Sequence, residues 1–188
     1  WLYRNRASGT TVTIGKFDGV HLGHQALLAK LSEVANQRKL DAVVLTFDRH
    51  PDAVLNPENV KPALIGAEQK MDLLLATLDA KHSAVFMLPF DDELAALSPR
   101  DFVMKHLVEN LKAKAVVVGH DFRFGRGGAG NLATLAELGK EFGYEVYEVP
   151  QVFVEGQAVS STRVRELLEV GDVETVARLL GRNHATIG

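Results

Sequence analysis

Residues 11–24 read TVTIGKFDGVHLGH, and this stretch decides the fold. Residues 11–14 are β-branched and lead into Gly15, which predicts a short buried strand that stops abruptly. A helical pattern begins at Gly23, and its apolar positions are Leu27, Leu28, Leu31, Val34 and Ala35. A strand followed almost at once by a helix is the repeating unit of parallel α/β sheets.

The turn between this strand and this helix is a candidate anion-binding site. Gly15, Gly19 and Gly23 remove side chains where a ligand would approach, and a helix start offers unpaired N–H groups at the positive end of its dipole. His21 and His24 are three residues apart, so their rings can lie on one side and donate to one phosphate chain. The alternatives are surface or capping histidines, or metal ligands; the chain offers no cysteine or H-E-x-x-H spacing to complete a metal site.

Composition limits the class of protein. The 188 residues are 46% hydrophobic and 24% charged, which predicts one soluble globular domain. The net charge of −3 provides no basic surface for nucleic acid or an anionic membrane, so a phosphate site has to be local. The lack of cysteine excludes a disulfide scaffold and is compatible with a reducing cytoplasm. No apolar run reaches membrane-spanning length, and the first residues, WLYRNRASG, do not read as a signal peptide.

The rest of the chain alternates strand-like apolar runs with helical patterns, which predicts a parallel α/β sheet. The further strands are expected at residues 42–47, 84–88, 115–118 and 144–149, and helices at residues 67–78, 98–111 and 129–142. In the first of these helices, the residues expected to face inward are Met71, Leu74, Leu75 and Leu78. Three prolines predict a loop over residues 50–65, and Glu155-Gly156 predicts a hairpin turn. Two short helices, residues 160–170 and 172–180, are expected to follow, and Ser98 and Asp172 are expected N-caps of their helices.

A glycine-rich stretch matches the dinucleotide-binding spacing G-x-G-x-x-G at Gly125, Gly127 and Gly130. A dinucleotide site needs its first glycine immediately after the first strand, whereas this stretch follows a late strand and a further segment, residues 119–124. We therefore interpret it as a glycine-rich loop and not as a dinucleotide-binding motif.

SSTRVR, at residues 160–165, is a second candidate for phosphate binding. The alternative is an ordinary capped helix start, with Ser160 as N-cap and solvated arginines. In a helix, Arg163 and Arg165 point about 200° apart, so both cannot reach one ligand. One arginine is therefore expected at the ligand and the other in packing or a salt bridge.

GKFDGVHLGH resembles the H-x-G-H signature of the nucleotidyltransferase superfamily. The residues around that signature are similar to the motif of the bacterial FAD synthetases, which combine a riboflavin kinase with an FMN adenylyltransferase. The resemblance extends over nearly the whole chain through GHDFRFG, PFDDELAALS, SSTRVR and LLGRNHATIG. Two residues depart from the family pattern: Arg49 replaces a usual proline, and Asp121 replaces a frequent asparagine.

The resemblance implies a Rossmann-like nucleotidyltransferase fold, with a parallel five-stranded sheet flanked by helices and a small additional β/loop subdomain. Residues 1–180 would form the FMN adenylyltransferase domain, and residues 181–188 would begin the linker to a C-terminal riboflavin kinase module absent from this chain. It also implies transfer of AMP from ATP to FMN, giving FAD and pyrophosphate, by in-line attack without a covalent intermediate. The expected cofactor is Mg²⁺ with ATP, the location is the cytoplasm, and neither nucleic acid nor a membrane is a partner.

Two other functions stay open. Another adenylyl- or cytidylyltransferase of the superfamily would share H-x-G-H and the SSTRVR-type loop but would lack the FRFG and PFD segments. A non-catalytic flavin- or nucleotide-binding module is the alternative from a different class.

The resemblance also implies roles for individual residues. The expected catalytic residues are His21, His24 and Arg165. The expected ATP-binding residues are Gly15, Lys16, Phe17, Gly19, Gly23, Ser161, Thr162 and Arg165. The expected flavin contacts are Asp121, Phe122 and Phe124. Phe124 would stack on the isoalloxazine ring, and Asp121 would contact Mg²⁺ through water.

Overall fold

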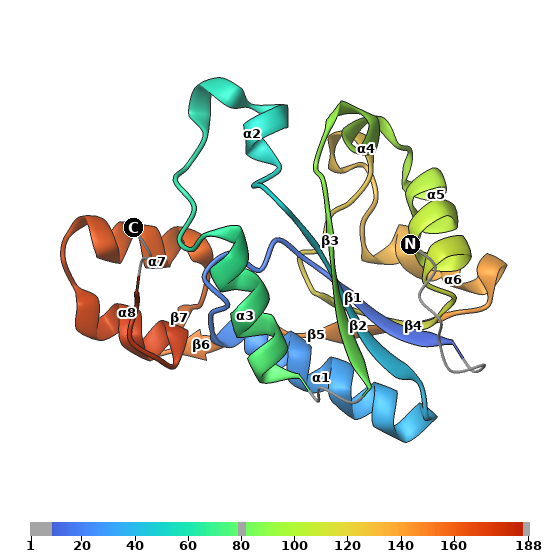
Figure 1. Cartoon of the computed structure of the whole chain (residues 1–188), viewed down its shortest axis with the longest axis horizontal. Helices are drawn as coiled ribbons and strands as arrows, with labels where there is room; N and C mark the ends of the chain where they lie inside the picture. The colour runs from blue at the N-terminus through green and yellow to red at the C-terminus, as the bar shows by residue number, and fades with distance from the viewer. Residues whose placement is uncertain (1–8, 79–81, 186–188) are drawn as a thin grey trace.

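The structure is a computed structural model that describes residues 9–78 and 82–185. Its centre is a five-stranded sheet in which every neighbouring pair of strands runs parallel, in the order β3-β2-β1-β4-β5 (Figure 1). The strands are β1 (Thr10–Ile14), β2 (Asp41–Phe47), β3 (Ser83–Leu88), β4 (Ala113–Gly119) and β5 (Glu145–Val149). The predicted parallel five-stranded sheet is therefore confirmed.

The strand order reverses at β1. The chain adds β2 and β3 on one side of β1 and then crosses over to add β4 and β5 on the other. In open parallel sheets, ligands bind outside the carboxyl ends of the strands at this kind of reversal. Here that position lies beyond Ile14 and Gly119, the last residues of β1 and β4.

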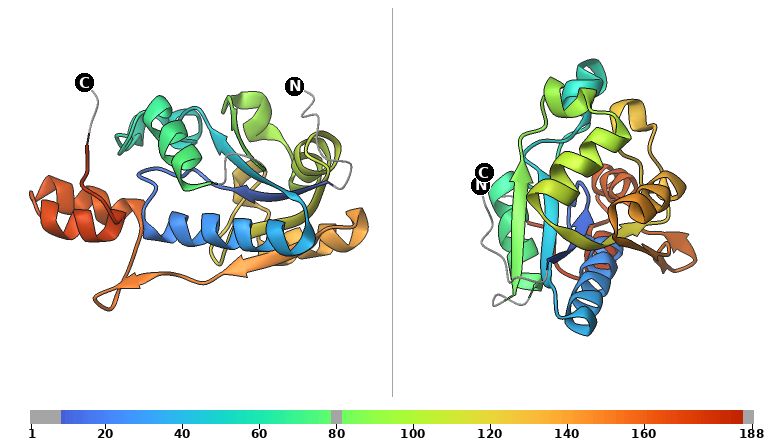
Figure 2. Two further views of the ribbon diagram at one scale, coloured as in Figure 1. Left: turned by 60° about the horizontal axis from the view of Figure 1, so that its bottom comes forward. Right: turned by 90° about the vertical axis from the view of Figure 1, so that its right-hand side faces the viewer.

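Helices cover both faces of the sheet, so the fold has three layers (Figures 1 and 2). The helices are α1 (Leu22–Arg38), α3 (Ala67–Thr77), α4 (Asp92–Ala96), α5 (Pro99–Phe102), its π-helical continuation η2 (Val103–Asn110) and α6 (Leu132–Phe142). On one face, α1 and α3 bury Leu31 and Leu74 against the sheet. On the other face, η2 and α6 bury Leu107 and Leu135.

A smaller unit lies beyond the beginning of α1 (Figure 2). It contains the hairpin β6 (Phe153–Val154) and β7 (Gln157–Ala158) and the helices α7 (Ser161–Glu169) and α8 (Val173–Leu180). Its separate core consists of Leu64, Val159, Val164, Val176, Leu179 and Leu180. The predicted hairpin and both closing helices are confirmed, and the hairpin forms a small two-stranded sheet separate from the five-stranded one.

Two expected segments differ in detail. The expected loop at residues 50–65 contains a one-turn helix, α2 (Asp52–Leu55), and a 3₁₀ turn, η1 (Pro57–Asn59). Proline is compatible with a helix start because the N–H that it lacks would be unpaired there. The helix expected from residue 129 begins at Leu132 because Asn131 caps it, its side chain accepting from Thr134 N at 3.0 Å.

The inward face of α3 also differs from the prediction. Leu75, expected to face the core, is 47% exposed, whereas the charged residue Lys70 is buried at 8%. The four-residue spacing places Lys70 on the same face as Leu74. Among the described residues, we find no helix long and apolar enough to cross a membrane.

Candidate active site

The turn that joins β1 to α1 has a strained backbone. Phe17 and Val20 have φ angles of 51° and 41°, and Gly19 has 82°. Such values are unusual for residues with a side chain, cost about 1–3 kcal/mol each, and persist only where surrounding contacts hold them. The ring of Phe17 is fully buried against α1 and the sheet. A ligand could therefore contact Phe17 only through its backbone.

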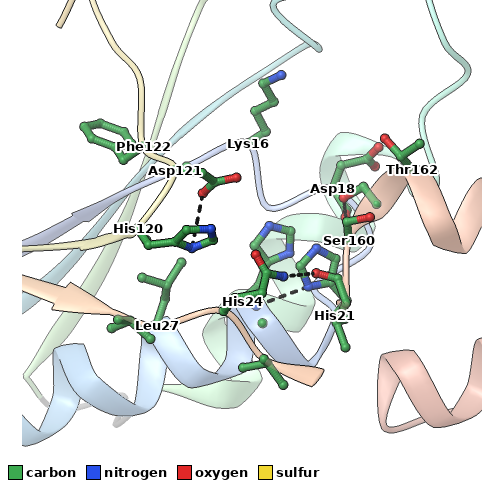
Figure 3. Close-up of a pocket in the computed structure, with 18 of the residues that line it drawn as sticks. Lys16, Asp18, His21, His24, Leu27, His120, Asp121, Phe122, Ser160 and Thr162 are labelled. Atoms are coloured by element: carbon green, nitrogen blue, oxygen red, sulfur yellow. Dashed lines mark hydrogen bonds and ion pairs between the residues drawn. The ribbon is translucent and has the colours of Figure 1, made fainter. Parts of the chain in front are cut away.

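His21 caps α1 and stacks on His24. Its Nδ1 accepts a hydrogen bond from the backbone N–H of His24 at 3.3 Å, and the ring centroids lie 3.7 Å apart with planes inclined by 12° (Figure 3). A Cβ at Gly23 would lie 3.1 Å from the His21 ring, so glycine leaves room for the stack. The predicted placement of both rings on one side is confirmed. Because Nδ1 of His21 accepts, the proton of the neutral ring is on Nε2, which is a donor.

Burial keeps both imidazoles neutral. Loss of solvation lowers the pKa of His21 to about 4. It holds the pKa of His24 well below 6.5, and the neighbouring His21 and Lys70 act in the same direction. Nδ1 of His24 is buried and has no hydrogen-bond partner among the described residues. An unpaired buried polar atom costs roughly 1–3 kcal/mol, so a ligand that supplied a partner would gain this amount.

A buried ion pair between Arg165 and Asp18 lies beside the histidines. The Nη2 of Arg165 donates to one carboxylate oxygen of Asp18, and its Nε donates to Pro62 O at 2.8 Å. The other carboxylate oxygen accepts from Leu64 N at 2.9 Å, and the backbone oxygen of Asp18 accepts from Ser161 Oγ at 2.8 Å. Asp18, which the sequence reasoning did not select, therefore connects the β1–α1 turn, the proline-containing loop and the start of α7.

The two arginines of SSTRVR diverge as predicted. Arg163 points to the hairpin, where its Nη1 donates to Gln157 O at 3.3 Å. Ser160 is the N-cap of α7, because its Oγ accepts from Arg163 N at 3.2 Å. The capped-helix interpretation is thus right for Ser160, whereas Arg165 lies at the candidate site.

A cavity of about 400 Å³ opens at the carboxyl ends of β1 and β4, and we call it the histidine cavity. The predicted site residues that line it are Gly15, Lys16, His21, Gly23, His24, Asp121, Phe122, Ser161, Thr162 and Arg165. Phe17 and Gly19 lie in the adjoining turn, where the Phe17 ring faces the core and a Cβ on Gly19 would lie 2.9 Å from Leu64.

A second cavity, of about 460 Å³, is rich in aromatic side chains, and we call it the aromatic cavity. The rings that line it are Phe47, Phe90, Phe102, Phe122 and Phe124. Phe122 and Phe124 stack with their centroids 5.4 Å apart. Phe124 is only 6% exposed and also contacts Phe102, so Phe122 presents more of its ring to the cavity than Phe124 does.

The two cavities meet at the end of β1. The residues that line both are Ile14, Gly15, Lys16, Asp52, Asp121 and Phe122. Lys16 is the one basic residue in this shared group of described residues. Its backbone oxygen accepts from Thr46 Oγ1 at 3.3 Å and from Lys70 Nζ at 3.4 Å, and Lys70 also donates to Phe47 O at 2.6 Å. With these two hydrogen bonds, Lys70 holds the ends of β1 and β2 together. Burial lowers the pKa of its ammonium group.

The carboxylates at the junction suit a metal that is shared with a substrate. Within residues 9–78 and 82–185, no group of three His, Cys, Asp or Glu side chains could hold a metal ion on its own. Mg²⁺, however, is commonly bound by one or two carboxylates together with substrate phosphates. Asp52 and Asp121 supply two such carboxylates, and the side chain of Asp121 is 81% exposed.

Comparison with known proteins identifies a family. The family model described as FAD synthetase matches residues 3–163. The bifunctional riboflavin kinase/FMN adenylyltransferases of Escherichia coli strain K12 and Pseudomonas fluorescens are 35% and 37% identical, over 96% and 93% of this chain. The chain spans about half the length of these relatives, 56% and 55%. A crystal structure described as a macrolide-efflux protein from Streptococcus pneumoniae has a TM-score of 0.80 at 28% identity, covering 94% of this chain and 56% of that one.

Proposed function

This chain belongs to the FAD synthetase family, and from that premise we propose that it is an FMN adenylyltransferase, which transfers AMP from ATP to FMN and releases FAD and pyrophosphate. The observation that carries the proposal is the junction of the histidine cavity with the aromatic cavity at Lys16 and Asp121. Such a junction lets a nucleotide and a flavin bring their phosphates to one point.

ATP would occupy the histidine cavity. Its phosphates would lie at the start of α1, where the N–H groups of the first helical turn and the positive end of the dipole favour an anion. His21, His24, Thr162 and Arg165 all line this cavity, and we assign them to contacts with the phosphates. Arg165 uses Nε and one Nη2 hydrogen for Pro62 and Asp18, so donors on its remaining nitrogen positions are left for a phosphate.

FMN would occupy the aromatic cavity. Its planar ring system suits a cavity lined by phenylalanines, and Phe122 borders both cavities. Its phosphate would then lie near Lys16, facing the phosphates of ATP. Only in this orientation does the attacking oxygen reach the nucleotide.

The reaction that we propose is a direct displacement. An oxygen of the FMN phosphate attacks the α-phosphorus of ATP; this P–O bond forms while the bond to the pyrophosphate oxygen breaks, and pyrophosphate leaves. No protein nucleophile is required, so the residues contribute positioning and charge stabilisation. His21 donates from its neutral Nε2, and Lys16 and Arg165 supply positive charge. When bound with the nucleotide, Mg²⁺ would be held by Asp52 and Asp121 and would screen the phosphate charges.

We retain residues 1–180 as the proposed adenylyltransferase domain and residues 181–188 as the start of a linker to a riboflavin kinase module, because the curated relatives are named for both activities. We also propose that the enzyme works on free ATP and FMN in the cytoplasm, and the net charge of −3 favours small-molecule substrates over a nucleic-acid partner.

The proposal is tested by incubating the purified chain with ATP, MgCl₂ and FMN and measuring FAD by chromatography and pyrophosphate by a coupled assay. We expect equal amounts of both, and loss of both when EDTA removes the metal. FMN binding without pyrophosphate release would support the non-catalytic flavin-binding module instead. Pyrophosphate release only with another phosphorylated acceptor, such as phosphopantetheine, would support a different nucleotidyltransferase.

A further inference from the structure

The segment after α8, residues 181–185, lies against the strained β1–α1 turn. Gly181 has a φ of 66°, and a Cβ there would lie 3.0 Å from Leu22 Cδ2, so the segment passes close to the start of α1. Further along, a ring nitrogen of His184 lies 3.0 Å from Leu64 O. The segment therefore contacts two of the elements that border the histidine cavity.

Arg182 makes the main connection within this segment. Its Nη2 donates to Gly19 O at 2.7 Å, and its Nη1 donates to Val20 O at 3.2 Å and to Leu180 O at 3.3 Å. The side chain of Gln25 reaches the same region, because its Nε2 donates to Val20 O at 3.0 Å and to Leu180 O at 2.8 Å. The carbonyl groups of two consecutive residues with positive φ thus accept from one guanidinium.

These contacts oppose relaxation of the turn. Gly19 and Val20 have left-handed backbone conformations, and Val20 is β-branched, so the turn persists only if surrounding contacts hold it. Hydrogen bonds from a charged donor are stronger than those from a neutral one. The planar guanidinium also holds its donors in a fixed arrangement that a flexible ammonium lacks.

His21 follows Val20 directly, so its position depends on this turn. We propose that Arg182 is a positioning residue for adenylyl transfer: by holding the carbonyl groups of Gly19 and Val20, it keeps His21 at the cap of α1 and stacked on His24. The inference rests on the proposed function in one respect, the assignment of His21 to a phosphate of ATP. Arg182 itself is not part of the described lining of either cavity.

The kinetic test compares Arg182→Met with Arg178→Met. Arg178 is the matched control because it lies one turn earlier, is 51% exposed, and binds Thr175 Oγ1 at 2.8 Å and faces Glu155 at 3.5 Å. In Arg182→Met we expect kcat to fall by about tenfold to a hundredfold, with the KM for FMN unchanged. The reason is that a small displacement of a catalytic group reduces the rate by up to about this factor. Arg178→Met should keep wild-type values, and Arg182→Lys should recover part of the loss because an ammonium still reaches one carbonyl.

A second measurement does not depend on FAD formation. In ligand-free protein, nitrogen–proton NMR of the imidazoles reports the pKa of His21, which burial lowers to about 4. If Arg182 holds the turn, Arg182→Met raises this pKa toward 6.5 because the ring gains solvent, and Arg178→Met leaves it unchanged. If the wild-type chain makes no FAD, the proposed function fails, but this titration still decides the role of Arg182.

The proposal is overturned if Arg182→Met is folded and keeps the wild-type kcat and the wild-type pKa of His21. It is also overturned if the KM for FMN rises as much as kcat falls, since that indicates general loosening of the fold. If Arg182→Met does not fold, Gln25→Met removes the other donor to Val20 O. We then expect a smaller shift of the His21 pKa in the same direction, and an unchanged pKa overturns the proposal.

Discussion

Arg165 and Asp18 form an ion pair in which each side chain is 9% exposed, at the border of the cavity that we assign to ATP. The two residues are 147 positions apart, and the carboxylate fixes the orientation of the guanidinium before any nucleotide arrives. Preorganised charge of this kind avoids reorganisation when phosphate charge develops. The pair therefore contributes both to the fold and to the proposed chemistry, and these contributions can be separated experimentally.

Arg165→Ala should reduce activity and stability together. The loss of a phosphate contact should raise the KM for ATP and lower kcat by about a hundredfold. The free energy of unfolding should fall by about 3–5 kcal/mol, because Asp18 is left buried without its partner. Urea unfolding and steady-state kinetics check both effects.

Two further variants separate the effects. Adding Asp18→Asn to Arg165→Ala removes the uncompensated charge, so stability should recover while activity does not. Arg163→Ala is the matched control and should stay near wild-type turnover, since its contact is with the hairpin. Equal losses in Arg163→Ala and Arg165→Ala would mean that the assignment of one arginine to ATP is wrong.

His21 should make the stability of the ligand-free protein depend on pH. An unfolded histidine has a pKa near 6.5, whereas the folded value is about 4. Between these values the unfolded chain binds more protons, so the contribution is complete above pH 6.5 and is lost as the pH falls toward 4. The shift corresponds to about 3 kcal/mol. Urea unfolding at pH 7 and pH 4.5 should show a smaller difference in His21→Gln than in wild type, while a loop variant, His120→Gln, should resemble wild type.

Lys16→Met should reduce kcat by about a hundredfold or more while changing stability by less than about 0.5 kcal/mol. Lys16 borders both cavities, so its charge lies where the two substrates' phosphates would meet. Lys30→Met is the control, because Lys30 pairs with Glu33 on the outer side of α1. A raised KM for ATP at unchanged kcat would show that Lys16 binds the ground state only.

Phe122 and Phe124 should respond differently to truncation. Phe122→Ala should raise the KM for FMN by about tenfold, since a stacking partner and its buried area are lost. Phe124→Ala should instead lower the free energy of unfolding by about 3–5 kcal/mol, because its ring is almost completely buried. A stable Phe124→Ala protein with a raised KM for FMN would support the original expectation that Phe124 stacks on the flavin.

The sequence predicted the parts of the fold that depend on local patterns. The buried strands β2 and β4 each contain a run of at least four apolar residues. The caps Ser98, Ser160 and Asp172 follow from residue type and spacing. The one-turn helix α2 is too short for helical periodicity to show. The apolar periodicity of residues 103–110 does not distinguish a π-helix from an α-helix over so short a length, so the π-helical η2 was not predicted.

The candidate site was predicted less completely, because its contacts join distant segments. Phe17 looked like a ligand contact, but its positive φ turns the ring into the core. Asp18 lies within the motif itself, yet its partner is in α7. Lys70 could have been noticed in the sequence, because it is a charged residue on the apolar face of a predicted helix. Its hydrogen bonds to the ends of β1 and β2 are visible only in the fold.

The most direct test of the central claim, adenylyl transfer to FMN, is chromatography of the products that the purified 188-residue chain makes from FMN or from riboflavin, each with ATP and Mg²⁺. We predict FAD and pyrophosphate from FMN and unchanged riboflavin, because riboflavin lacks the phosphate that attacks ATP. The sequence also contains no G-x-x-x-x-G-K-[ST] loop for a second phosphate site. FMN or ADP accumulating from riboflavin at a comparable rate, or no FAD from FMN, would contradict the account.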